Sequence, residues 1–205
     1  MASSEVQHEH HHHEHGHHEH GQDAHEHLPH GAEGHVHDES CAVAHGSAVA
    51  PAQDKVLAAV FATPVASYLL RYGADAGYRA VLIEPDPELA KSATADGFEI
   101  TSSLAGIPAD ITDVVVTDHH RDDLGTALRD ALSAGARWVG IMGSPRAEPP
   151  HIAALTQLGV PSGEIAKVHR PIGLNIGSRT PAEIAIATIA GLIADRNAKP
   201  GGFAF

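Results

Sequence analysis

Short apolar runs alternate with amphipathic stretches along the chain from residue 55 onward. The run at 55–61, Lys-Val-Leu-Ala-Ala-Val-Phe, is typical of a strand buried on both faces. Similar runs predict further strands at 79–84, 98–101, 113–117, 137–142 and 167–169. Because these strands alternate with stretches of helical periodicity, they predict parallel βαβ units and an open, doubly wound α/β sheet.

Two of the predicted helices begin with strong local signals. Thr63 and Pro64 suit the N-cap and first helical position of a helix that ends near Gly73. The stretch 180–183, Thr-Pro-Ala-Glu, has the pattern of a capping box at the start of the closing helix. The apolar face predicted for this closing helix consists of Ile184, Ile186, Ile189, Leu192 and Ile193. Other helices are predicted over 87–96, 122–134 and 151–158.

The first fifty residues differ in composition from the rest of the chain. They contain fifteen of the nineteen histidines and nine acidic residues but no Lys or Arg, so they carry −9 of the total charge of −13. They also contain almost no large apolar side chains, and such a segment cannot offset the conformational entropy lost on ordering. We therefore predict a disordered histidine-rich arm at 1–50 and one folded domain at 51–205.

The histidine run predicts a metal-binding function for the arm. Neutral imidazole is a common ligand of Zn²⁺ and Ni²⁺, and many imidazoles on one flexible chain offer several interchangeable sites. The alternatives are a purification tag or a solvated low-complexity arm. Cys41 is predicted to be an inert or an occasional metal-coordinating thiol. The candidate ligands are His8, His10, His11, His12, His13, His15, His17, His18, His20, His25 and His27.

Charge and hydropathy exclude several classes of protein. A chain with 13 basic and 26 acidic residues lacks the basic face that binding to a nucleic-acid backbone requires. No apolar run is long enough for a transmembrane helix, and the first residues do not resemble a secretion signal. A single cysteine fits a reducing compartment, so we expect a cytoplasmic protein that contacts neither nucleic acid nor membrane.

Polar residues follow several predicted strands, at the edge of the sheet where ligands bind in open α/β folds. Residues 143–146, Gly-Ser-Pro-Arg, combine free N–H groups, a hydroxyl and a guanidinium that suit a phosphate, or they form only a turn. Residues 175–179 have similar chemistry, and Arg179 could clamp an anion or pair with Glu183. Residues 118–120, Asp-His-His, could contact a ligand or a metal, or cap the helix that follows.

The turn after the first strand argues against an ordinary dinucleotide site. Such a site needs glycines for close approach to the pyrophosphate, and residues 61–64 read Phe-Ala-Thr-Pro. NAD(P) binding is therefore not expected. Glu84, after the second strand, would suit a ribose hydroxyl or be an exposed acid in a turn. His151 and His169 stand alone and are predicted to be structural.

Three stretches resemble the XdhC/CoxI family, namely 140–144 (Gly-Ile-Met-Gly-Ser), 158–161 (Leu-Gly-Val-Pro) and 171–184. The resemblance covers about residues 55–196 and implies a Rossmann domain of an accessory protein for molybdenum hydroxylases such as xanthine dehydrogenase. Family members usually carry another domain before this one, and they have a glycine-rich first turn. They also have Thr-His-Asp-His where this chain has Thr-Asp-His-His at 117–120.

The family's function is implied to be the binding of molybdenum cofactor and its transfer to the apoenzyme. The resemblance favours His120 as a pocket residue. Together with the strand-end chemistry, it gives the candidate cofactor-binding residues Thr63, Thr117, His119, His120, Gly143, Ser144, Arg146, Asn175, Gly177 and Arg179.

Three functional hypotheses follow. The leading one is a non-catalytic accessory protein that binds a molybdenum-pterin cofactor and assists maturation of a molybdenum hydroxylase, while its arm binds Ni²⁺ or Zn²⁺. The alternative is a nickel or zinc storage or delivery protein for another metalloenzyme, such as a hydrogenase. The third, an NAD-linked oxidoreductase, follows from the fold alone. The sequence leaves open whether the protein is a monomer or a homodimer.

Overall fold

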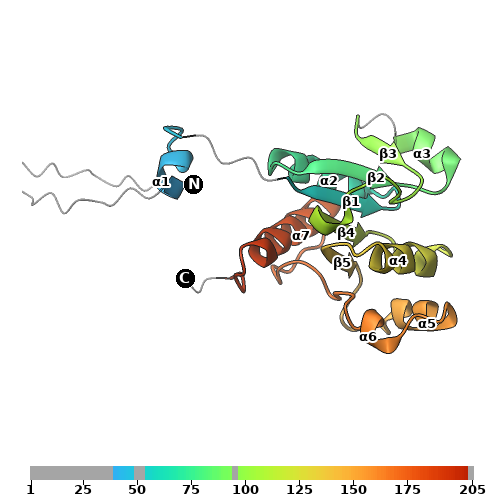
Figure 1. The fold of residues 1–205 in the computed structure, drawn as a ribbon. Helices are drawn as coiled ribbons and strands as arrows, with labels where there is room; N and C mark the ends of the chain where they lie inside the picture. Colours follow the sequence, from blue (N-terminus) through green and yellow to red (C-terminus); the bar gives the residue numbers. More distant parts are fainter. Residues whose placement is uncertain (1–38, 49–53, 94–96, 203–205) are drawn as a thin grey trace, which may run out of the picture. The chain divides into compact units, whose positions relative to one another are not determined.

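The computed structural model describes residues 39–48, 54–93 and 97–202. The chain separates into two units, Met1–Ala50 and Pro51–Phe205. The described part of the first unit contains helix α1, Glu39–Ala44 (Figure 1). This helix corrects the expectation that regular structure is absent throughout 1–50. Its sequence, Glu-Ser-Cys-Ala-Val-Ala, contains two alanines, the residue type with the highest helix propensity. The candidate metal ligands His8 to His27 lie outside the described residues.

The second unit contains a five-stranded sheet in which every pairing is parallel. Its order is β3-β2-β1-β4-β5, which confirms the predicted doubly wound topology. The order reverses between β1 and β4, and this reversal is where ligands bind in such sheets. The strands are β1 Val56–Val60, β2 Arg79–Ile83, β3 Glu99–Thr101, β4 Thr112–Val116 and β5 Trp138–Ile141.

Helices cover both faces of the sheet (Figure 1). One apolar core joins the sheet to α2 and α7, and the other joins it to α4, α5 and α6. Alternate strand residues face the two cores, as Leu57 and Ala58 do, because successive side chains of a strand point to opposite faces. The helices of this unit are α2 Pro64–Asp75, α3 Pro87–Ala93, α4 Leu124–Ser133, α5 Pro150–Gln157, α6 Ser162–Ile165 and α7 Pro181–Arg196, with a 3₁₀ turn η2 at Ala109–Ile111.

Both predicted helix starts are confirmed. The Thr63 hydroxyl accepts a hydrogen bond from the Ala66 N–H and caps α2. Thr180 and Glu183 form the reciprocal bonds of the capping box at the start of α7. The predicted apolar face of α7 is only partly correct, because Ile186 and Ile193 are exposed. They lie seven residues apart on the outer side of α7, whereas the buried side packs on α2 and the sheet.

The outer edge of the sheet differs from the prediction. The strand expected at 167–169 is a single parallel bridge between Gly140 and His169. The His169 N–H donates to the Val139 carbonyl, and the Ile141 N–H donates to the His169 carbonyl. The imidazole of His169 stacks on Trp138, with ring centroids 4.8 Å apart and planes 7° from parallel. Helix α6 precedes this bridge and was not predicted.

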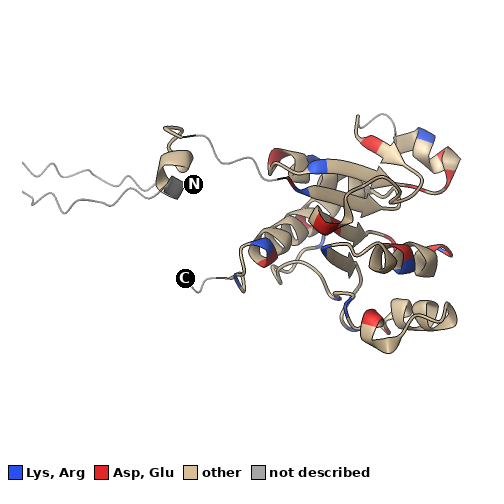
Figure 2. Ribbon diagram, viewed as in Figure 1, with Lys and Arg blue, Asp and Glu red and all other residues tan. Residues whose placement is uncertain are grey.

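A buried ion cluster ties the end of α7 to the start of β4. The Asp113 carboxylate is fully buried and accepts hydrogen bonds from the guanidinium groups of Arg137 and Arg196. Arg137 also pairs with Asp195. Elsewhere in this unit, basic and acidic residues are interspersed along the helices and strands (Figure 2). Within the part of the chain that the structure describes, no helix is long and apolar enough to cross a membrane.

Candidate ligand-binding cleft

A cleft of about 660 Å³ lies beyond the ends of β4 and β5. Its walls come from the segments that follow these two strands, from the loop at 171–178 and from the first turns of α7. Val65, at the start of α2, completes the lining. The cleft therefore occupies the edge at which parallel α/β sheets place their ligands, and its size is within the usual range of small-molecule sites.

Six of the predicted site residues line this cleft. They come from three separate segments, which the parallel arrangement of the strands brings to the same edge of the sheet. Gly177 has a φ of +71°, a positive value that glycine tolerates. The six residues are Thr117, His119, Gly143, Ser144, Asn175 and Gly177.

The other four predicted residues do not line the cleft. The Thr63 hydroxyl caps α2, bonds to Thr117 Oγ1 at 3.0 Å, and borders a separate hollow beside α2 and α3. His120, which the resemblance favours as a pocket residue, is exposed and lies outside the cleft lining, whereas its neighbour His119 lies within it. Arg146 and Arg179 directly follow the lining residues Pro145 and Ser178, and both are exposed.

The proposed pairing of Arg179 with Glu183 is made by the backbone and not by the guanidinium. The Glu183 carboxylate accepts the N–H groups of Arg179 and Thr180, at 2.7 and 3.0 Å. These hydrogen bonds lower the pKa of Glu183. The Arg179 side chain makes no ion pair with the residues that the structure describes, so its charge remains available near the loop.

Glu84 fills the turn after β1, where a dinucleotide would place its phosphates. Its carboxylate accepts the N–H of Ala62 at 2.8 Å and that of Asp86 at 3.0 Å. Arg121 donates to both carboxylate oxygens, and its guanidinium lies 4.6 Å from the Phe61 ring centroid. Glu84 is 1% exposed, so it is neither a free ribose ligand nor an exposed turn acid, the two alternatives that the sequence left open.

His119 contributes the titratable side chain among the described lining residues. Burial lowers its pKa, and the nearby His120 and Arg170 lower it further against the opposing effect of Asp118. The two imidazole centroids lie 4.0 Å apart. His119 is therefore a neutral imidazole at pH 7, able to donate one hydrogen bond and accept another.

Arg170 shapes the cleft from behind and was missed by sequence reasoning. One terminal nitrogen donates to the carbonyls of Ser144 and Ala147, at 2.7 and 3.1 Å, and so holds the loop after β5. A Cβ on Gly143 would lie 2.9 Å from Arg170 Nε, so a larger residue there would force the Arg170 side chain to shift. Nothing in the local sequence links Arg170 to a loop more than twenty residues earlier. The available signal for Arg170 was its position, since it is a charged residue directly before the loop at 171–178 that was predicted to contact a ligand.

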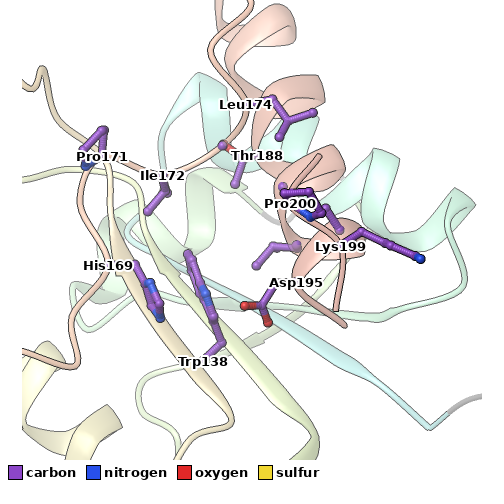
Figure 3. A pocket seen from close by; sticks show the side chains of 13 residues that line it. Trp138, His169, Pro171, Ile172, Leu174, Thr188, Asp195, Lys199 and Pro200 are labelled. Carbon is purple, nitrogen blue, oxygen red and sulfur yellow. The ribbon is translucent and has the colours of Figure 1, made fainter. Parts of the chain in front are cut away.

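A second, smaller hollow of about 240 Å³ shares the segment 171–174 and Thr188 with the cleft. Figure 3 shows the stacked rings of Trp138 and His169 on one side of it and Asp195 and Lys199 on another. Asp195 already pairs with Arg137. Among the described residues, no three His, Cys, Asp or Glu side chains are grouped so that they could hold a metal ion.

An all-parallel sheet of this order, with a ligand-sized cleft beyond its strand ends, defines a Rossmann-type binding domain. Comparison with known proteins agrees: the profile of the XdhC Rossmann domain matches residues 57–192. The chain therefore belongs to the XdhC Rossmann domain family, as its motifs suggested.

Two known proteins show the extent of the similarity. The chain is 37% identical over 76 residues to the uncharacterized protein YqeB of Escherichia coli (strain K12), covering 37% of this chain and 14% of YqeB. The crystal structure of a xanthine dehydrogenase from Bacillus halodurans has a TM-score of 0.58 at 22% identity, covering 71% of this chain and 45% of that one. The second likeness shows a shared fold. This chain matches less than half the length of either protein.

Proposed function

We propose that this protein is a cytoplasmic, non-catalytic accessory protein that binds molybdenum cofactor in the cleft and passes it to a molybdenum hydroxylase apoenzyme. The cleft beyond β4 and β5 carries this proposal, because two of the three segments that resemble the XdhC/CoxI family, 140–144 and 171–184, contribute residues to its walls. Membership of the XdhC Rossmann domain family supports an accessory role for a xanthine dehydrogenase-type enzyme. The cofactor is cargo in this proposal, and its molybdenum chemistry takes place in the recipient enzyme.

The residues of the cleft fit a pterin-type ligand. The cleft of about 660 Å³ has room for a fused ring system, and apolar side chains such as Met142 and Ile172 can pack on its faces. The His119 imidazole and the Asn175 amide offer hydrogen bonds to its edge. Gly177, where a Cβ would meet no atom within 4 Å, lets the backbone come close to the ligand.

The turn after β1 favours this ligand over NAD(P). Ala62 N–H, which could otherwise face a pyrophosphate, donates to Glu84. Glu84 in turn is buried and paired with Arg121, so it offers no free oxygen to a ribose. An NAD-linked oxidoreductase is therefore the least supported of the three hypotheses.

The direct test is anaerobic titration of the full-length, chelator-treated protein with molybdenum cofactor. Saturable binding at one cofactor per chain is expected. Arg146→Ala combined with Arg179→Ala should weaken binding, because these exposed guanidinium groups are placed beside the lining and can attract the cofactor's phosphate. Arg129→Ala, on the surface of α4, is the matched control. Absence of saturable binding would contradict the proposal.

The composition of the arm supports a second function, storage or delivery of Ni²⁺ or Zn²⁺. Fifteen histidines in fifty residues give a high local density of neutral imidazole ligands at pH 7. Proton competition should weaken this binding in acid, because each ligand must be deprotonated. The recipient in this case is another metalloenzyme under assembly, such as a hydrogenase.

Metal stoichiometry of the full-length chain tests the function of the arm. Replacing the arm histidines by Gln should abolish most Ni²⁺ and Zn²⁺ binding. The matched control replaces the arm glutamates by Gln and keeps every imidazole, and this variant should bind as the original does. Equal stoichiometry in the histidine-free variant would refute the metal-binding arm without affecting the proposal for the cleft.

A further inference from the structure

The cleft lining contains no Lys, Arg, Asp or Glu among the described residues. The guanidinium of Arg170 lies behind the lining residue Gly143, where one terminal nitrogen donates to the carbonyls of Ser144 and Ala147. The described side chains that line the cleft thus carry no formal charge while His119 is neutral.

Most hydroxyl groups of the lining are engaged within the fold. Thr117 Oγ1 donates to the carbonyls at the end of β1, Ser178 Oγ donates to the Glu183 carbonyl, and Thr188 Oγ1 donates to the Ile184 carbonyl. The side chains of His119 and Asn175 make no hydrogen bond with any described residue. The Ser144 hydroxyl accepts the Arg146 N–H and is still free to donate, whereas His119 and Asn175 are free both to donate to a ligand and to accept from it.

These two groups share one chemical property, which is that each can both donate and accept while carrying no charge. Burial and the neighbouring His120 and Arg170 lower the pKa of His119, so its imidazole stays neutral at pH 7. The same lining includes the apolar side chains of Val65, Met142 and Leu174. An apolar lining that also carries neutral donor–acceptor groups complements a heterocyclic ring, whereas an anion would lose its hydration there without a cationic side chain in the lining to pair with.

Resting on the proposed function, we propose that the cleft binds the uncharged ring of the ligand, a 2-amino-4-oxo-pteridine, with His119 and Asn175 on its hydrogen-bonding edge, and leaves the phosphate outside. The exposed guanidinium groups of Arg146 and Arg179 flank the lining and meet the phosphate in solvent. Ring recognition then sets specificity, and the phosphate adds a modest, salt-sensitive increment.

The test uses two probes with the same ring, 6-hydroxymethylpterin and its diphosphate, titrated into the full-length protein and followed by pterin fluorescence. Both are expected to bind, the diphosphate about three- to tenfold more tightly at low salt. Added salt should remove this difference and leave the binding of 6-hydroxymethylpterin unchanged. Arg146→Ala with Arg179→Ala should also remove the difference and leave that binding unchanged.

Matched variants identify the ring contacts. His119→Gln and Asn175→Asp should each weaken 6-hydroxymethylpterin about tenfold, the loss expected for one ligand hydrogen bond. Arg129→Ala, on the surface of α4 and outside the lining, should leave binding unchanged. Far-UV circular dichroism and thermal midpoints confirm that each variant is folded.

Each remaining outcome contradicts a distinct claim. If molybdenum cofactor or the diphosphate binds while 6-hydroxymethylpterin does not, the phosphate occupies the cleft and the inference fails, whereas the proposed function stands. If none of the three binds, both fail. Guanosine carries the same aminopyrimidinone edge, so tighter binding of guanosine than of 6-hydroxymethylpterin would replace the pterin ring by a nucleoside base.

Discussion

The Glu84 carboxylate receives both terminal nitrogens of Arg121, at 3.0 and 3.3 Å, across 37 residues of sequence. The Glu84 side chain is fully buried and that of Arg121 is 20% exposed. With two backbone N–H groups also donating to Glu84, this pair closes the turn between β1 and α2 from inside. The region that holds a pyrophosphate in dinucleotide-binding relatives of this fold is here part of the protein's own hydrogen-bond network.

Removing Arg121 should destabilise the fold strongly. Arg121→Ala leaves a buried carboxylate without its countercharge, and we expect a loss of about 2–4 kcal/mol in the free energy of unfolding. Urea denaturation at pH 7 measures this loss. Arg79→Ala is the matched control, because Arg79 forms a similar two-point contact with Glu99 on the surface and should cost little. Equal losses in the two variants would show that the burial of Glu84 does not matter.

Asp113 should be a second stability determinant, at the opposite end of the sheet. Its buried carboxylate accepts from Arg137 and Arg196, so Asp113→Asn leaves two guanidinium groups short of a countercharge. We expect the free energy of unfolding to fall by about 3 kcal/mol. Asp195→Asn removes the exposed partner of the same Arg137 and should cost much less. If the two variants have the same denaturation midpoint, the buried ion pairs of Asp113 with Arg137 and Arg196 contribute no more to stability than the exposed pair of Asp195.

Two glycines of the cleft loop allow strain and crowding to be separated. Gly173 and Gly177 both have positive φ, at +82° and +71°. A Cβ at Gly173 would lie 2.9 Å from the Ala187 carbonyl carbon, whereas a Cβ at Gly177 meets no atom within 4 Å. Gly177→Ala should therefore cost about 1 kcal/mol for backbone strain alone. Gly173→Ala should cost a further 1–3 kcal/mol because the loop must move from α7.

The measurement for this pair is the thermal midpoint together with the affinity for 6-hydroxymethylpterin. Gly173→Ala should weaken binding as well as stability, because the displaced segment lines the cleft. If Gly173→Ala has a thermal midpoint and a 6-hydroxymethylpterin affinity no lower than those of Gly177→Ala, the close packing of this loop on α7 is contradicted.

Stability should fall as the pH drops through the range in which free histidine titrates. Burial lowers the pKa values of His119 and His151, and nearby cationic groups lower them further. The unfolded chain therefore binds more protons than the folded one as the pH falls below about 7, so acid favours unfolding. The stabilisation is complete above the unfolded pKa and is progressively lost below it.

Thermal midpoints between pH 8 and pH 5 test this linkage. His119→Gln with His151→Gln should flatten the pH dependence of the midpoint relative to the unaltered chain. The difference at pH 8, where these imidazoles are neutral in both states, gives the cost of the substitutions themselves. A slope that survives intact in the double variant would assign the acid sensitivity to other groups.

Local signals in the sequence were reliable where they depend on near neighbours. Thr63 and Thr180 cap their helices as predicted, because a capping hydroxyl bonds to an N–H only three residues away. The apolar runs became parallel strands, and their alternation with helices confirmed the fold class. The same rules did not predict α1, Glu39–Ala44. This helix is only six residues long, and the histidine-rich composition of residues 1–50 led us to expect no regular structure there.

The composition of the candidate site was predictable in part, and its geometry was not. Gly143, Ser144, Asn175 and Gly177 were found because polar and glycine residues after buried strands must gather at one edge of a parallel sheet. The choice of His119 over His120 depends on the direction in which the chain leaves β4. Pattern alone does not specify that direction, since adjacent side chains diverge.

The parallel α/β fold, the helix starts and the chemical character of the strand ends could all be predicted from the sequence, because each is encoded by periodicity or by neighbours within a turn. The internal use of Glu84, the outward direction of Ile186 and Ile193, and the hold of Arg170 on the loop behind the cleft became visible in the folded chain alone. Each of these outcomes depends on partners from distant segments, and burial and charge pairing are set where those segments meet.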